Sequence, residues 1–113
     1  MAEPQALVVC LCAEWCGVCR EYRSAFDQVA ALFPQMRFLW VDVEDESDLV
    51  DPIDIDDFPT LLLALGDQPR FFGIVRPQAA RLEQLVREHL QREGSVLPTP
   101  EVAALLTRLR ALA

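Results

Sequence analysis

Two apolar runs in the first half of the chain have the pattern of buried strands. Residues Ala6 to Cys12 are continuously apolar and β-prone, which is typical of a strand covered on both faces. The second run extends from Arg37 to Val43. Between the two, apolar residues recur at helical spacing up to Pro34, at Val18, Tyr22, Phe26, Val29, Ala30 and Phe33. A right-handed crossover then predicts a parallel strand–helix–strand unit with 6–12 as the central strand.

The second half predicts a hairpin followed by two helices. Strands at Thr60–Leu65 and Arg70–Val75 flank the turn residues Gly66-Asp67-Gln68-Pro69. Pro77 suits the first turn of a helix with one apolar face, formed by Leu82, Leu85, Val86 and Leu90. A last leucine-striped helix is expected over residues 100–112. We therefore predict an α/β fold with a four-stranded mixed sheet flanked by helices and an extra C-terminal helix.

The length of 113 residues, 52% of them hydrophobic, fits one core. We expect residues 1–93 to form the domain. Residues 94–113 are expected to be a proline-containing linker and a helix that packs on the same domain or at a dimer interface. The protein would then be a monomer or a weak homodimer.

Charge and composition exclude several classes of function. A net charge of −8 argues against binding nucleic acid or an anionic membrane. The chain has no lysine, which excludes Schiff-base chemistry and the lysine of a phosphate-binding loop. The first residues carry no basic cluster, and the run 6–12 is too short for a signal sequence or a membrane span. The expected location is the cytoplasm. His89, within a helical pattern, is expected on a helix surface.

Cys16 and Cys19 carry the candidate chemistry. They are separated by two residues at the predicted strand-to-helix junction, where unpaired backbone N–H groups and the helix dipole favour a thiolate. Cys16 at the helix tip can attack a partner's disulfide, and Cys19, one turn further, can resolve the mixed disulfide. The same spacing also occurs in half of many zinc sites, so the strand–helix context decides the interpretation.

The residues around this pair are similar to those of the thioredoxin family. The run Ala13-Glu14-Trp15-Cys16-Gly17-Val18-Cys19 resembles the family's active-site run, and Phe58-Pro59-Thr60-Leu61 resembles its cis-proline loop. The similarity covers about residues 6 to 93. It implies dithiol–disulfide exchange with protein substrates, no bound cofactor and a role in cell redox homeostasis. Reduction by a flavoprotein of the thioredoxin reductase type is also implied.

The resemblance also assigns substrate-binding residues. Pro59 would be cis and face the cysteine pair, and the backbone of Phe58 would pair with the substrate chain. Trp15 and Gly17 would form the docking surface beside the pair.

The sequence departs from the family in four respects. The family's first strand and helix are missing, which leaves one sheet edge less protected. Cys10 stands at the family's buried aspartate, Trp40 at its lysine, and Val18 at its usual proline. Loss of both charged partners leaves no uncompensated buried charge, and it predicts slower or differently poised exchange.

Cys10 and Cys12 lie two residues apart and should share a face of the strand. We expect each to be a buried inert thiol. The alternative is that the four cysteines bind a metal or pass disulfides among themselves.

The acidic stretch 44–57, with one expected helical turn near Leu49 and Val50, should be a solvated loop whose field repels acidic partners. A different class of function also remains open: a thioredoxin-fold binding module or chaperone with little redox activity.

Overall fold

The computed structural model describes residues 5–13, 16–50, 58–90 and 99–112. Its sheet contains β1 (Ala6–Cys12), β2 (Arg37–Asp42), β3 (Thr60–Leu65) and β4 (Gln68–Ile74) in the order β2-β1-β3-β4. Strand β1 is parallel to β2 and antiparallel to β3, and β3 is antiparallel to β4. The predicted four-stranded mixed sheet and the central position of 6–12 are confirmed.

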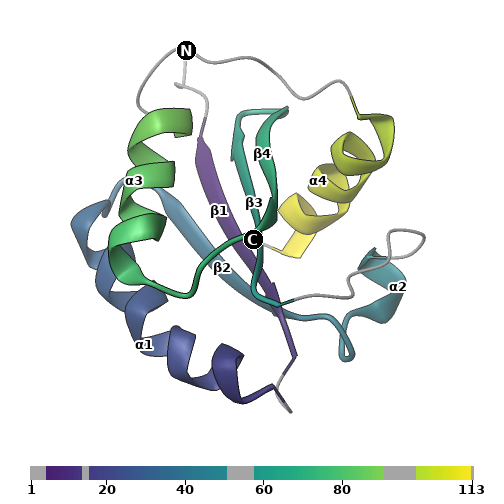
Figure 1. Ribbon diagram of the computed structural model, residues 1–113. Helices are drawn as coiled ribbons and strands as arrows, with labels where there is room; N and C mark the ends of the chain where they lie inside the picture. Colours follow the sequence, from purple (N-terminus) through teal and green to yellow (C-terminus); the bar gives the residue numbers. More distant parts are fainter. Residues whose placement is uncertain (1–4, 14–15, 51–57, 91–98, 113) are drawn as a thin grey trace.

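Helices cover both faces of this sheet. Figure 1 shows α1 (Gly17–Leu32) and α3 (Ala79–Leu90) on one face, with α4 (Pro100–Leu112) and the single turn α2 (Ser47–Val50) on the other. None of the helices in the described ranges is long and apolar enough to cross a membrane.

The two faces of β1 explain its continuous apolar run. Alternate residues belong to the core under α1 and α3, namely Ala6, Val8, Cys10 and Cys12. The intervening residues belong to the core under α4, namely Leu7, Val9 and Leu11. Every residue of β1 is buried, because each side chain meets a helix layer on one side of the sheet or the other.

An aromatic cluster holds α1 against the sheet. The ring of Phe26 packs edge-on against Phe38 and Trp40 of β2, with centroid distances of 5.3 Å and 5.5 Å. Helix α1 ends at Leu32, and the N–H of Phe33 donates to the carbonyl of Ala30. The middle of α1 is thereby anchored to β2 by packing between aromatic rings.

One arginine connects helix α4 to the end of the sheet that contains the β3–β4 turn. The guanidinium of Arg110 donates to the carbonyls of Gly66 and Gln5, at 2.8 Å from Nε and 2.9 Å from Nη2 respectively. Gly66 has a φ of 63°, a left-handed conformation that favours glycine in the β3–β4 turn.

Two details differ from the sequence expectations. Pro77 precedes α3 by two residues, because Gln78 accepts the first helical hydrogen bond from the N–H of Leu82. Strand β4 begins at Gln68, so the turn is shorter than expected and Pro69 lies within an edge strand, where its missing N–H is tolerated. At the other edge, β2 pairs only with β1 among the described strands.

Candidate functional site

One end of the sheet gathers segments that are far apart in the sequence. Strand β1 ends where β3 begins, since Leu11 pairs with Thr60, and β4 ends there because Thr60 also pairs with Ile74. The residues that follow β1, precede β3 and follow β4 therefore leave the sheet at the same end of its strands. A hydrogen bond from the N–H of Val75 to the carbonyl of Pro59, at 3.1 Å, joins two of these segments.

Cys16 occupies the N-cap position of α1. Its backbone is extended, with φ −83° and ψ 119°, and its carbonyl accepts a hydrogen bond from the N–H of Arg20 at 3.2 Å. Its side chain is half-buried and makes no capping hydrogen bond. Cys16 thus lies at the end of α1 where the backbone N–H groups of the first turn have no intrahelical partner and the helix dipole is positive.

Gly17, the first residue of α1, is exposed beside Cys16. A Cβ built there would meet nothing nearer than the guanidinium of Arg20, at 3.9 Å. The backbone next to Cys16 is therefore open to an approaching chain. Trp15, the other residue expected at the docking surface, lies outside the described residues.

Cys19 is bonded to a cysteine of the strand. It forms a disulfide with Cys12, with the two Cα atoms 5.8 Å apart, while Cys10 and Cys16 are free. Cys12 and Cys19 are 0% and 1% exposed, so this bond lies inside the core. The expectation that Cys12 is an inert thiol is wrong for this state of the protein. Alternate residues of β1 face α1, and Cys12 is one of them. The first turn of α1 brings Cys19 over the end of the strand, next to Cys12.

Cys10 extends the sulfur cluster deeper into the core. Its sulfur lies 3.5 Å from that of Cys12, and burial raises the pKa of the Cys10 thiol, opposed in part by the charge of Arg23. The hydroxyl of Tyr22 has no hydrogen-bond partner among the described residues. Burial, and secondarily the nearby Cys10, raises the Tyr22 pKa. Both groups are therefore neutral near pH 7.

The positions that match the family's aspartate and lysine are neighbours. Cys10 pairs in register with Trp40 across β1 and β2. The guanidinium of Arg23 lies over the Trp40 indole, 4.9 Å from its ring centroid. A neutral thiol and an indole thus fill the place of a charged pair.

The peptide bond between Phe58 and Pro59 is cis, as the family resemblance implied. Pro59 is buried, and Phe58 packs against the core under α1. The cis bond thus immediately precedes β3, at the end of the sheet where β1 also ends.

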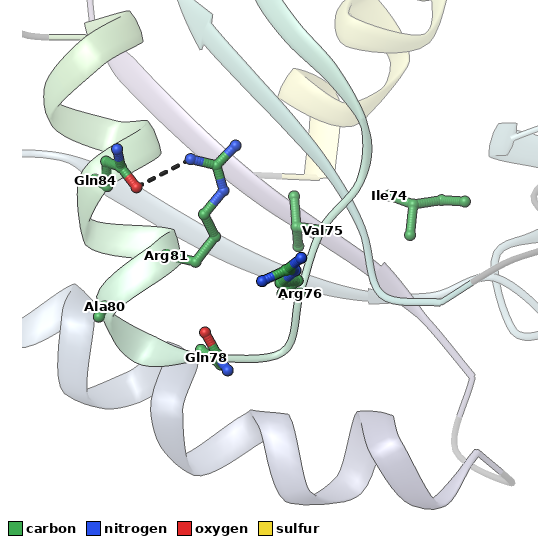
Figure 2. A pocket seen from close by; sticks show the side chains of 7 residues that line it. All are labelled: Ile74, Val75, Arg76, Gln78, Ala80, Arg81 and Gln84. Atoms are coloured by element: carbon green, nitrogen blue, oxygen red, sulfur yellow. Dashed lines mark hydrogen bonds between the residues drawn. The ribbon is translucent and has the colours of Figure 1, made fainter.

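Two surface hollows flank this end of the sheet. One, of about 360 Å³, is lined by Cys19, Arg20, Arg23, Trp40, Asp42, Asp45 and Ala13. The other, of about 590 Å³, lies between the end of β4 and the start of α3. Figure 2 shows Arg76 and Arg81 in this second hollow, where Arg81 donates to Gln84 at 3.0 Å. Within the described part of the chain, the second hollow is therefore lined by positive side chains without an acidic one, whereas the first carries two arginines and two aspartates.

Among the described residues, no group of three or more histidine, cysteine, aspartate or glutamate side chains is arranged to hold a metal ion.

The comparisons with known proteins agree with this geometry. The family model described as Thioredoxin matches residues 1–88. A thioredoxin H-type from Oryza sativa subsp. indica is 31% identical over 86 residues, covering 76% of this chain and 70% of the relative. Thioredoxin H4-2 from Oryza sativa subsp. japonica is 27% identical over 78 residues, covering 67% of this chain; the match spans 59% of that relative's length.

Among solved structures, the thioredoxin NaTrxh from Nicotiana alata superposes with a TM-score of 0.68. It is 26% identical, and the match covers 80% of this chain and 76% of the other. The family model spans well over half of the chain and includes both the cysteine pair and the cis-proline loop. The chain belongs to the thioredoxin family.

Proposed function

We propose that this protein is an oxidoreductase that exchanges disulfides with protein substrates through a mixed disulfide on Cys16, which Cys19 resolves. One observation carries the proposal. Cys16 lies half-exposed at the N-terminus of α1, and Cys19, three residues later, is buried and already bonded to a third cysteine. An accessible sulfur above a redox-active buried sulfur is what two-step exchange requires.

The reaction starts from the reduced protein. The Cys16 thiolate attacks one sulfur of the substrate disulfide, so that one S–S bond breaks, a mixed disulfide forms and a substrate thiolate leaves. The Cys19 thiolate then attacks the Cys16 sulfur and releases the second substrate thiolate. The substrate gains two electrons, and the protein holds one new disulfide.

Exposed apolar side chains support a protein substrate. The large hydrophobic residues exposed in the described structure are Val18, Leu32 and Ile74. Val18 lies two residues from Cys16 and is 44% exposed; Ile74, at 58%, pairs with Thr60 next to the cis-proline. Two of the three thus lie at the site, where burial under a substrate chain would stabilise the complex.

The substrate chain would be placed by backbone contacts. We propose that the backbone of Phe58 pairs with it beside Pro59, and that Gly17 and Trp15 complete the docking surface. The open space beside Gly17 supports this arrangement. A flavoprotein reductase as electron source and a cytoplasmic location complete the proposal, and both rest on the family resemblance and the composition.

The test is reduction of insulin disulfides in the presence of dithiothreitol. The wild-type protein should accelerate the reaction above the reagent alone, and Cys16→Ser and Cys19→Ser should abolish the acceleration. Cys10→Ser changes a buried cysteine that has no role in the two steps, so it should remain active and serves as the matched control.

A wild-type rate equal to that of dithiothreitol alone would overturn the proposal. It would favour a thioredoxin-fold binding module in which the cysteines take no part in catalysis.

A further inference from the structure

The disulfide in this structure leaves the exposed cysteine unbonded. We propose that Cys12 is a third redox-active residue. It replaces Cys16 as the disulfide partner of Cys19 by internal exchange, so that Cys16 is again a free thiol in the oxidised protein. This inference rests on the proposed function and adds a step to it.

The geometry makes the two possible bonds of Cys19 mutually exclusive. Cys12 is the last residue of β1, and its Cα lies 5.8 Å from that of Cys19, within the range that disulfides bridge. Cys16 lies three residues before Cys19 on the same helical turn. Cys19 can therefore bond outward to Cys16 or inward to Cys12, and the structure contains the inward bond.

The exchange step balances without another reactant. After substrate reduction the protein contains a Cys16–Cys19 disulfide and a Cys12 thiol. The Cys12 thiol gives up its proton and attacks the Cys19 sulfur; the Cys16–Cys19 bond breaks, the Cys12–Cys19 bond forms, and Cys16 leaves as a thiolate that can take the proton. The number of disulfides stays at one.

Cys10 is not the alternative partner. Two residues apart on an extended strand, Cys10 and Cys12 have Cα atoms roughly 6.6 Å apart, near the upper end of what a disulfide spans. Their sulfurs lie 3.5 Å apart, the distance of a weak sulfur hydrogen bond. The structure bonds Cys19 to Cys12 and leaves Cys10 as a free thiol beside that bond.

The consequence is an oxidised state that still presents a nucleophile. Both cysteines of the inner disulfide are at most 1% exposed, so an external reductant cannot reach that bond directly. Cys16 remains half-exposed. It can capture a second disulfide, or reopen the inner bond by attacking Cys19.

Disulfide mapping tests the proposal, because a glutamate-specific protease separates the cysteines. Cleavage after Glu14 and Glu21 gives peptides 1–14, with Cys10 and Cys12, and 15–21, with Cys16 and Cys19; Pro4 blocks the site at Glu3. The full-length protein is oxidised with one equivalent of diamide, acid-quenched, alkylated with N-ethylmaleimide in denaturant and digested at mildly acid pH.

The expected product in the wild type is a disulfide-linked pair of the two peptides, alkylated at Cys10 and Cys16. Cys12→Ser should instead give peptide 15–21 with an internal disulfide. The matched variant Cys10→Ser, from the same strand and face, should keep the linked pair. Alkylation of the folded protein gives a second readout. The oxidised wild type should react at Cys16, whereas oxidised Cys12→Ser should react at none of its three remaining cysteines.

The outcomes separate the two proposals. If the wild type reduces insulin but yields only the internal disulfide in peptide 15–21, Cys12 has no redox role and the proposed function stands. If the linked pair forms but insulin is not reduced, the inner disulfide is structural and both proposals fail. Should Cys12→Ser not fold, the wild-type map and the native alkylation of Cys16 decide alone.

Discussion

Cys10 shows how burial controls an ionisable side chain. It is 0% exposed, and desolvation raises its pKa above the ordinary value of 9.0. In the unfolded chain the thiol loses its proton above about pH 9, whereas in the folded protein it keeps it. The unfolded state then binds fewer protons, so the free energy of unfolding falls as the pH rises.

The first prediction follows from this sign. With a phosphine reductant present throughout, the free energy of unfolding from urea titrations should fall from about pH 9 upward, by at most about 1.4 kcal/mol per pH unit for Cys10. Tyr22 adds to the loss at higher pH, because its pKa is raised as well. Cys10→Ala should remove the Cys10 part and make the profile less steep, while the buried thiols of Cys12 and Cys19, released by the reductant, contribute alike in both proteins. Parallel profiles for the two proteins would show that Cys10 ionises equally in both states.

Residue roles at the site were only partly readable from the sequence. Spacing at a strand–helix junction indicated Cys16 and Cys19, and the resemblance indicated the cis bond at Pro59. The bond between Cys19 and Cys12 was not predicted, although the alternation of side chains along a strand already placed Cys10 and Cys12 on one face. Whether that face meets the first turn of α1 depends on how the helix crosses the sheet, which no local pattern encodes.

The elements were more predictable because their signals are periodic. The apolar run of β1 and the helical spacing in α1 follow directly from which side chains are buried. Element ends were less accurate: Pro77 was expected inside α3, but the carbonyl of Gln78 starts the helix. The position of α4 followed from no pattern, since a leucine stripe does not reveal which surface it covers.

The second prediction concerns the packing of α4 on the sheet. Leu105 is 0% exposed and packs in the core with Leu7, Val9 and Leu11, so Leu105→Ala should lower the free energy of unfolding by about 2–5 kcal/mol. Leu32→Ala makes the same change in α1 at a side chain that is 54% exposed, and it should cost no more than about 0.5 kcal/mol. Equal losses in urea denaturation would mean that α4 does not pack on the sheet in solution.

At the scale of the whole molecule, net charge and local charge oppose each other. The chain carries −8 overall, whereas in the described structure four arginines against two aspartates line the hollows at the active-site end. The radius of gyration is 13.1 Å. At about 0.01 M salt the Debye length of roughly 30 Å exceeds this radius, so the net charge governs encounter; at about 0.15 M it shrinks to roughly 8 Å and only nearby charges act.

The third prediction uses two small disulfides of opposite charge. At low salt the reduced protein should react faster with cystamine, which is cationic, than with the anionic dithiodiglycolate. The difference should shrink as salt is added. Stopped-flow measurement of both rates checks this, with the neutral 2-hydroxyethyl disulfide as the control for intrinsic reactivity. Faster reaction of the anionic compound at low salt would show that the arginines outweigh the net charge.

The proposed disulfide exchange depends on a covalent intermediate at Cys16. The most direct measurement is to mix reduced Cys19→Ser with a protein disulfide substrate and to identify the conjugate by mass spectrometry after digestion. We predict a stable mixed disulfide in peptide 15–21 at Cys16, only transient in the wild type and absent from a Cys16→Ser, Cys19→Ser double variant. Absence of the conjugate, or its attachment at Cys10 or Cys12, would contradict exchange through Cys16.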